Sequence, residues 1–217
     1  MHPAFDDYAG ERFQMVRSQL KGRDIRDKSV LWAMEKVPRH AFVPENYQRS
    51  AYADHPLPIG HKQTISQPYI VAYMTEALGI KGKDRVLEVG TGSGYQAAVL
   101  AEVAAHVYTI EIVAPLGKQA KRICTELGYK NISFRVGDGY GGWPSAAPFD
   151  AIMVTAAPNH VPQALVEQLK IGGRLILPVG DKHQQLIVIE KRSGGVFHKR
   201  VMDVRFVPMT GEAQRKK

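Results

Sequence analysis

The amino-acid sequence predicts an α/β protein built on a doubly wound, mainly parallel sheet of seven strands, with helices N-terminal to it and antiparallel strands at its C-terminal edge. Three observations favour this fold. Short apolar, β-branched runs alternate with helical patterns beyond residue 80. A glycine-rich turn follows the first of these runs. The last two strand-like segments alternate between apolar and polar residues, as antiparallel edge strands commonly do.

The first 80 residues combine helical patterns with a long aperiodic segment. Apolar residues recur at helical spacing in three stretches, so helices are expected over 7–20, 27–37 and 68–78. Pro38 ends the second helix, and residues 39–44 are expected to be extended. Residues 53–68 have no periodicity and are expected to form an irregular loop. Loops of that length are usually functional or disordered, and the small polar side chains here favour function.

Beyond residue 80 the chain alternates between strand and helix. Strands are expected over 85–89, 106–110, 132–136, 149–154, 174–178, 185–190 and 199–207. Helices are expected over 96–104, 114–127 and 162–169. Residues 149–154 form a very apolar run, which predicts a central strand. The alternation predicts a mainly parallel sheet with helices on both faces.

The length and composition suit one folded domain. The chain has 217 residues, of which 44% are hydrophobic and 23% charged. These values are ordinary for a globular protein. We expect a single domain over 1–217, with a helical and substrate-loop region over 1–80, a cofactor-binding core over 81–210 and a basic tail over 211–217.

Several classes of protein are disfavoured by the composition. No apolar run approaches the roughly 20 residues of a membrane span, and no signal-peptide pattern is present, so a cytoplasmic protein without a membrane partner is expected. Cys124 is the only cysteine, which suits a reducing compartment. No cluster has metal-ligand spacing, so no metal is expected. The net charge of +8 is scattered outside the tail, which disfavours a specific nucleic-acid partner. A monomer is expected.

The glycine-rich turn is the most informative stretch. Gly90, Gly92 and Gly94 follow the pattern G-x-G-x-G, whereas a dinucleotide site needs G-x-G-x-x-G. Glu88 precedes the turn, and its carboxylate disfavours a phosphate and favours a cation. The stretch resembles the first motif of S-adenosylmethionine-dependent methyltransferases, whose ligand carries a sulfonium and an amino group and no phosphate. A glycine-rich turn with no ligand is the alternative.

Two further carboxylates follow the next strands. Glu111 ends the second strand at the spacing of about 20 residues from which an acidic group reaches a ribose diol. Asp138 follows the third strand and can accept a hydrogen bond from the exocyclic amine of an adenine. The alternatives are an exposed charge for Glu111 and, for Asp138, a turn aspartate that bonds its own backbone. Carboxylates at three successive strand ends, including Glu88, are more specific than any one of them.

A wider set of motifs resembles the protein-L-isoaspartate O-methyltransferase family over about residues 12–210. The motifs are Pro58-Ile-Gly60, Gln63-Thr-Ile-Ser-Gln-Pro-Tyr69, Gly137-Asp-Gly139, Asp150-Ala-Ile152, Thr155-Ala-Ala-Pro158 and Leu169-Lys-Ile-Gly-Gly173. The glycine turn alone identifies only the superfamily. Its combination with Thr-Ile-Ser-Gln-Pro makes the resemblance specific.

The resemblance implies a Rossmann-like repair enzyme that acts on isoaspartyl-containing proteins and peptides. Such an enzyme methylates the free α-carboxylate of L-isoaspartyl residues and releases S-adenosylhomocysteine; the ester then closes to a succinimide. The implied catalytic residue is Ser66, and the implied substrate-binding residues are Pro58, Ile59, Gly60 and Ser66. The implied S-adenosylmethionine-binding residues are Gln63, Thr64, Ile65, Glu88, Gly90, Thr91, Gly92, Gly94, Glu111, Ile112, Asp138, Gly139, Thr155 and Thr210.

The chain departs from the family pattern at one position. The family usually has glycine directly before Gln-Thr-Ile-Ser, and here Lys62 occupies that position after His61. The lysine places a cation beside a site for an anionic group. Two roles stay open: Lys62 either helps to bind the carboxylate or points to solvent, and we favour solvent.

The implied reaction needs no strong base. A carboxyl group has a pKa near 4, so the nucleophile is already ionised at neutral pH. The difficulty is to hold the anion in line with the methyl group, and positioning can supply roughly 7–11 kcal/mol of the barrier. We expect the Ser66 hydroxyl to donate to one carboxylate oxygen and so to aim the other at the methyl group.

Three alternative functions are disfavoured. An enzyme that methylates nucleic-acid bases commonly has a polar-Pro-Pro-aromatic run after the fourth strand, whereas this chain has Thr155-Ala-Ala-Pro158. An NAD-dependent oxidoreductase disagrees with the glycine spacing and with Glu88. A non-catalytic cofactor-binding module is disfavoured because both Ser66 and Asp138 are present.

Overall fold

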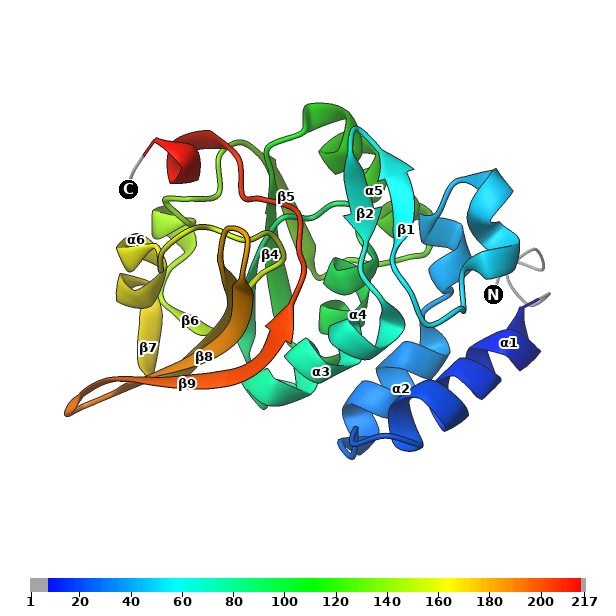
Figure 1. Cartoon of the computed structure of the whole chain (residues 1–217), viewed down its shortest axis with the longest axis horizontal. Coiled ribbons are helices and arrows are strands. Elements are labelled where there is room, and N and C mark those ends of the chain that lie inside the picture. Colours follow the sequence, from blue (N-terminus) through cyan, green and yellow to red (C-terminus); the bar gives the residue numbers. More distant parts are fainter. Residues whose placement is uncertain (1–7, 216–217) are drawn as a thin grey trace.

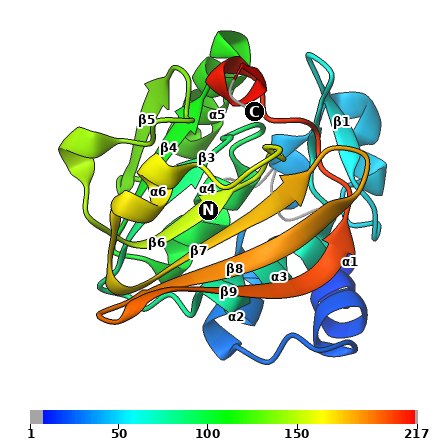
Figure 2. The ribbon, with the colours of Figure 1, turned by 60° about the vertical axis from the view of Figure 1, so that its left-hand side comes forward.

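A seven-stranded sheet forms the centre of the molecule in the computed structural model, which describes residues 8–215 (Figure 1). The strand order is β5-β4-β3-β6-β7-β8-β9. The strands are β3 (Arg85–Val89), β4 (His106–Glu111), β5 (Ile132–Val136), β6 (Phe149–Val154), β7 (Leu169–Gly180), β8 (Gln184–Arg192) and β9 (Gly195–Val204). β3 to β7 run parallel, and β8 and β9 are antiparallel. The predicted fold class is confirmed, and Figure 2 shows β5 and β9 at opposite edges.

Helices cover both faces of the sheet. They are α3 (Pro68–Leu78), α4 (Tyr95–Val103), α5 (Ala114–Glu126) and α6 (Gln163–Glu167). Met74 of α3 and Leu100 of α4 share one core cluster with Val86 and Met153 of the sheet. Leu165 of α6 packs with sheet residues of the opposite face in a second cluster. The very apolar strand β6 lies between β3 and β7, as its sequence predicts.

The N-terminal helices pack outside this layer. α1 (Ala9–Gln14) continues into the π-helical segment η2 (Met15–Lys21), and α2 (Lys28–Lys36) packs on α4. The Asp27 carboxylate caps α2 by accepting from the backbone of Ser29 and Val30. The helix predicted over 7–20 is therefore present from Ala9 to Lys21, and Asp7 lies outside the described residues.

Residues 39–44 are not extended, so that prediction is wrong. They begin with a turn of 3-10 helix, η3 (Arg39–Phe42), and a second such segment, η4 (Glu45–Ser50), follows. The turn places Arg39 and Phe42 on the same side, where both contact the Tyr95 ring. Burial of these side chains against α4 therefore outweighs the extended tendency around Pro38.

Residues 53–68 contain a β-hairpin, which the sequence analysis missed. β1 (Leu57–Gly60) pairs antiparallel with β2 (Gln63–Ile65). His61 and Lys62 form the turn with φ angles of 51° and 59°. Turns with two residues at positive φ usually contain Asn-Gly, and this one contains neither residue, so the usual hairpin signal is absent.

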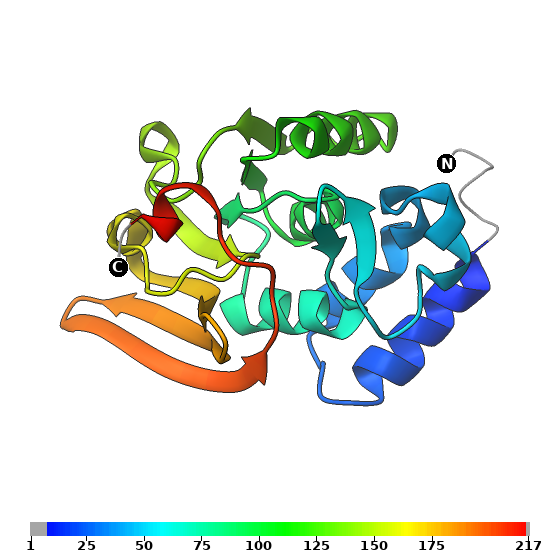
Figure 3. The ribbon, with the colours of Figure 1, turned by 45° about the horizontal axis from the view of Figure 1, so that its top comes forward.

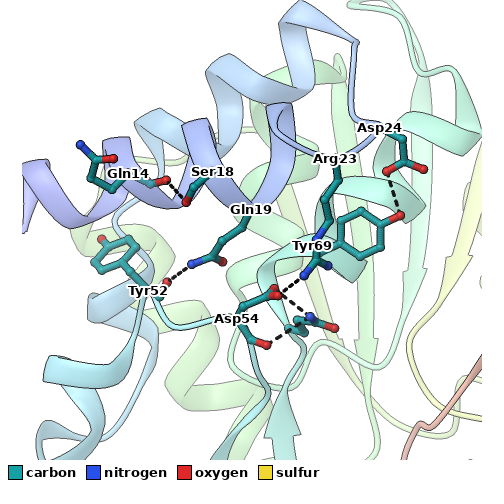
Figure 4. A network of polar contacts seen from close by, with 9 residues as sticks. Gln14, Ser18, Gln19, Arg23, Asp24, Tyr52, Asp54 and Tyr69 are labelled. Atoms are coloured by element: carbon teal, nitrogen blue, oxygen red, sulfur yellow. Dashed lines mark hydrogen bonds and ion pairs between the residues drawn. The ribbon is translucent and has the colours of Figure 1, made fainter.

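A network of polar contacts holds this hairpin against η2 (Figure 4). Gln67 Nε2 donates to Asp54 Oδ1 at 2.7 Å, and the other Asp54 oxygen pairs with Arg23. Gln19 Nε2 donates to the Tyr52 carbonyl at 2.7 Å. The residues before β1 are thus anchored to η2 through Gln19 and to Arg23, and Gln67 after β2 is joined to them through Asp54.

The C-terminal third differs in element length from the prediction. β7 begins at Leu169, before the strand predicted over 174–178, so the helix predicted over 162–169 is shorter and α6 stops at Glu167. β9 is displaced toward the N-terminus, because the chain leaves the sheet after Val204. Ala157 N donates to the Val207 carbonyl at 2.8 Å, and Met209 N donates to the Ala157 carbonyl at 2.8 Å. Figure 3 shows this segment (red) passing between the sheet and the β1–β2 hairpin. A short 3-10 helix, η6 (Gly211–Gln214), follows, while Lys216 and Lys217 of the predicted tail lie outside the described residues.

Candidate active site

A cavity lies beyond the carboxyl ends of β3, β4 and β6, where the strand order reverses. Ligands of open α/β sheets bind at this place. Four parts of the chain that are distant in sequence form its walls. They are residues 63–66 of the hairpin, the glycine turn, the residues that end or follow β4, β5 and β6, and residues 207–210.

The glycine turn runs close to β6. Gly90 has a φ of 99°, and a Cβ there would lie 2.4 Å from Thr155 Oγ1. Thr155 Oγ1 donates to the Gly90 carbonyl at 2.6 Å, which fixes this approach. A Cβ at Gly94 would lie 2.9 Å from the Ala120 side chain of α5. Gly90 therefore shapes the cavity wall, whereas Gly94 lies behind the wall and allows α4 and α5 to pack together.

Glu111 is a buried carboxylate on the cavity wall. Its Oε2 accepts from Gly92 N at 2.7 Å, and its Oε1 accepts from Val113 N at 2.8 Å. These bonds hold the carboxylate against the turn, and each oxygen has a second lone pair for a ligand hydroxyl. Ile112 follows on the wall with 41% of its surface exposed.

Asp138 lies on the same wall as Glu111. Its Oδ1 accepts from Tyr140 N at 2.9 Å, as in a local turn, and its Oδ2 accepts from Glu212 N at 2.8 Å. Asp138 therefore both bonds the backbone of its own turn and lines the cavity. Gly139 also lines the cavity. The link to Glu212 ties the C-terminal segment, including Thr210, to the end of β5.

Glu88 lies beneath the turn, is fully buried and does not line the cavity. Thr109 Oγ1 donates to Glu88 Oε2 at 2.5 Å, and Thr109 Oγ1 is 2.6 Å from Thr91 Oγ1. Thr91 does line the cavity, so these hydroxyls connect it to the buried carboxyl group. The other Glu88 oxygen has no hydrogen-bond partner. Burial, with a contribution from the charge of Glu111, raises the pKa of Glu88 to about 8.

The hairpin supplies the wall formed by Gln63, Thr64, Ile65 and Ser66. Among residues 8–215, no side-chain or backbone group hydrogen-bonds to the Ser66 hydroxyl, which is half-buried beside the cavity. The implied substrate residues Pro58, Ile59 and Gly60 are on β1, outside the cavity lining. The structure thus brings Ser66 and the implied cofactor residues together, except for Glu88 and Gly94, which lie behind the wall.

Several lining residues were missed by the sequence analysis. They are Val71, Val89, Ser93, Tyr95, Gln96, Ile110, Val113, Ala156, Val207, Pro208 and Met209. Most adjoin a predicted site residue, and that proximity is the only signal that marks them in the sequence. Gln96 is distinguished by a bond from its Nε2 to Thr75 Oγ1 at 3.0 Å, which links α4 to α3.

The lining suits a cationic ligand that carries a diol. The described residues that line the cavity include two carboxylates, Glu111 and Asp138, and no lysine, arginine or histidine. Glu88 lies behind the wall, and its raised pKa keeps it mostly protonated at neutral pH, so the expectation that its carboxylate favours a cation is not met. The carboxylate acceptors of Glu111 and Asp138 fit S-adenosylmethionine, which has a sulfonium, an ammonium group and a ribose diol. Within residues 8–215, no group of three His, Cys, Asp or Glu side chains is arranged to hold a metal ion.

The sheet order, the G-x-G-x-G turn and this acidic cavity define an S-adenosylmethionine-dependent methyltransferase with a Rossmann-like fold. The family model described as Protein-L-isoaspartate(D-aspartate) O-methyltransferase matches residues 11–214. The chain belongs to this family.

Curated relatives and solved structures agree with this family. A protein-L-isoaspartate O-methyltransferase of Opitutus terrae is 60% identical over 93% of this chain and 88% of its own length. One of Gloeobacter violaceus is 58% identical over 91% of this chain and 98% of its own length. A solved protein-L-isoaspartate O-methyltransferase has a TM-score of 0.86 at 31% identity, covering 93% of this chain and 67% of that one. A Plasmodium falciparum structure carrying the same family name, in complex with S-adenosyl-L-homocysteine, has a TM-score of 0.77 at 27% identity, covering 92% and 98%.

Proposed function

We propose that this chain transfers a methyl group from S-adenosylmethionine to the free α-carboxylate of L-isoaspartyl residues in damaged proteins and peptides. The observation that carries the proposal is that one cavity is lined by two unlike kinds of group. The carboxylates Glu111 and Asp138 suit a cation, and the Ser66 hydroxyl, which the hairpin supplies to the same cavity, suits an anion. The family to which the chain belongs supplies the identity of that anion.

We assign the cofactor to the acidic wall. Glu111 binds the ribose diol, because its bonds to the turn leave acceptor capacity toward the cavity. Asp138 and Gly139 hold the adenine. The turn from Gly90 to Gly92, with Thr91, receives the amino-acid end, and the remaining contacts come from Gln63, Thr64, Ile65, Ile112, Thr155 and Thr210. Bound there, S-adenosylmethionine supplies an electrophilic methyl group and a neutral thioether leaving group.

The chain's own contribution is to position an ionised carboxylate. No general base is required, since the isoaspartyl carboxyl group is deprotonated at neutral pH. The Ser66 hydroxyl donates to one carboxylate oxygen and turns the other toward the cofactor side of the cavity. Residues 207–210 and the hairpin both line the cavity in which this positioning takes place. Orientation of this kind supplies roughly 7–11 kcal/mol of a barrier.

The test is transfer of labelled methyl to two synthetic peptides that differ only in L-isoaspartate or L-aspartate at one position. Base-labile label on the isoaspartyl peptide alone is the expected result, because the linkage formed is a methyl ester. Cofactor binding with no transfer to either peptide would retain the methyltransferase class and refute the substrate.

We further propose that the protein acts as a monomeric, single-domain enzyme of the cytoplasm with no specific nucleic-acid partner. The support is the lone cysteine, Cys124, which is buried, and the scattered distribution of the basic residues. Light scattering during size-exclusion chromatography tests the monomer, and RNA binding at low salt tests the partner. Among the described residues, no helix has the length and apolar character to cross a membrane.

A further inference from the structure

The turn of the β1–β2 hairpin carries backbone strain. His61 and Lys62 are the only residues other than glycine with positive φ in the described part of the chain. The left-handed conformation is unfavourable for residues with a Cβ, and glycine relieves it. The chain nevertheless has two long side chains at these successive positions. Both side chains are exposed, so their burial offers no compensation for the strain.

The acidic lining of the cavity disfavours binding of an anionic substrate, and a cation at the rim would offset this repulsion. The described lining residues include Glu111 and Asp138 and no basic side chain. This lining attracts a cationic cofactor, but it repels the anionic peptide that must enter beside it. Lys62 directly precedes Gln63, the first hairpin residue of the wall. Within residues 8–215, Lys62 pairs with no carboxylate, so its charge is available to a ligand.

The spacing along β2 determines which part of a peptide Lys62 can reach. Ser66 lies four positions after Lys62, which corresponds to about 13 Å at about 3.3 Å per extended residue. A carboxylate held at Ser66 is therefore too distant for Lys62. A substrate peptide that runs extended alongside β2, with its isoaspartyl residue at Ser66, advances by the same rise per residue. Lys62 then lies opposite a side chain two to four residues from the isoaspartyl residue.

We propose that Lys62 is a specificity-determining residue that binds the carboxylate of an aspartate or glutamate two to four residues from the isoaspartyl residue. The preferred substrates are thus acidic peptides. This inference rests on the proposed function, and it assigns to the strained turn a role beyond connecting two strands.

The test uses isoaspartyl peptides that carry either Glu or Gln at one of the second to fourth positions on each side. We expect kcat/KM to be roughly three- to fivefold higher for Glu than for Gln at one or more positions, mostly through KM, because exposed ion pairs have about this strength. The preference should shrink at 0.5 M salt, a concentration of about the order that screens exposed charges. It should be lost in Lys62→Gln and retained in Lys62→Arg. Lys83→Gln is the matched control, since Lys83 precedes β3 at the opposite end of the sheet.

Two results would overturn the inference while the proposed function stands. One is equal kcat/KM for the Glu and Gln peptides at every position, and the other is a preference that survives in Lys62→Gln. Methyl transfer to the Gln peptides by the unaltered protein tests the proposed function separately. Absence of transfer to every isoaspartyl peptide refutes that function and this inference with it.

Lys62→Gly separates recognition from folding. Glycine relieves the strain at a φ of 59°, so we expect a Tm equal to or above that of the unaltered protein. The same variant should lose the preference for Glu peptides while it methylates Gln peptides normally. A lower Tm with an equal loss on both sets of peptides would make Lys62 a structural residue and overturn the inference.

Discussion

Asp54 and Gln67 join the two ends of the hairpin that carries the Ser66 side of the cavity. Gln67 Nε2 donates to Asp54 Oδ1 at 2.7 Å and to the Asp54 carbonyl at 3.1 Å. Arg23 of the N-terminal region pairs with the second carboxylate oxygen (Figure 4). Since Gln67 directly follows Ser66, the position of the proposed catalytic hydroxyl depends on a contact made outside the cavity.

Loss of this contact should slow the reaction without weakening cofactor binding. In Asp54→Ala, Gln67 loses its side-chain acceptor and the hairpin base loosens. We expect kcat to fall roughly ten- to a hundredfold, since a shift of about 1 Å in a reacting group costs up to about a hundredfold. Steady-state kinetics measure the fall in kcat, and calorimetric titration with S-adenosylmethionine measures the cofactor affinity, which should not change. Glu126→Ala, which removes an exposed pair with Arg122 on α5, is the control and should change neither.

Ser66→Ala tests the proposed catalytic hydroxyl directly. The half-buried hydroxyl makes no bond that holds the fold, so the variant should keep the Tm of the unaltered protein. Turnover of an isoaspartyl peptide should fall about a hundredfold, the usual effect of removing one oriented donor. The dissociation constant of S-adenosylmethionine should change by less than about twofold, which is under 0.5 kcal/mol. Equal losses in turnover and cofactor affinity would instead assign Ser66 a structural role.

Gly90→Ala should weaken cofactor binding by distorting the glycine turn. The added Cβ would meet Thr155 Oγ1 at 2.4 Å, and the φ of 99° is unfavourable for alanine. We expect the dissociation constant of S-adenosylmethionine to rise by about tenfold or more, because strain of this kind costs about 1–3 kcal/mol. Gly82→Ala is the matched control: a Cβ there meets no atom within 4 Å. An unchanged affinity in Gly90→Ala would show that the turn does not contact the cofactor.

The raised pKa of Glu88 predicts how the stability of the folded protein depends on pH. Burial raises its pKa from 4.5 to about 8 in the folded protein, so the folded state holds a proton that the unfolded state releases. The stabilising contribution is complete below pH 4.5 and is lost as the pH rises through about 8. Glu88→Gln keeps the shape and cannot ionise. Its Tm relative to the ligand-free unaltered protein should therefore increase between about pH 4.5 and about pH 8 and level off at higher pH. A constant difference across this range would contradict a buried, protonated Glu88.

The sheet could be predicted because its signals are local. β3, β4, β5 and β6 are short apolar runs between helical patterns, and their observed bounds match the predicted ones to within a residue. The antiparallel pair at the edge was predicted from its alternating pattern. The lengths of β7 and β9 were not, because they depend on partners elsewhere in the sheet. The start of β7 pairs with Phe149 of β6 through Leu169, and its end and β9 pair with β8.

The parts of the candidate site that come from a short continuous motif could be predicted from the sequence. The glycine turn and the residues after β4 and β5 all face a common cavity, as parallel strands require. The burial of Glu88 could not be foreseen, because it depends on Thr109 of the neighbouring strand. The hairpin was missed since its turn lacks glycine and asparagine, and the wall formed by Val207 and Met209 depends on contacts with Ala157 that no local pattern encodes.

The last wall of the cavity is also the last part of the fold in chain order. A product truncated before Val207 would retain all seven sheet strands, the glycine turn and Ser66. It would lack both the bonds to Ala157 and the Glu212 amide that holds Asp138. Premature termination in this region would therefore yield a folded core with an open, incompetent pocket. Closure of the cofactor cavity therefore depends on a segment that adds no strand to the sheet.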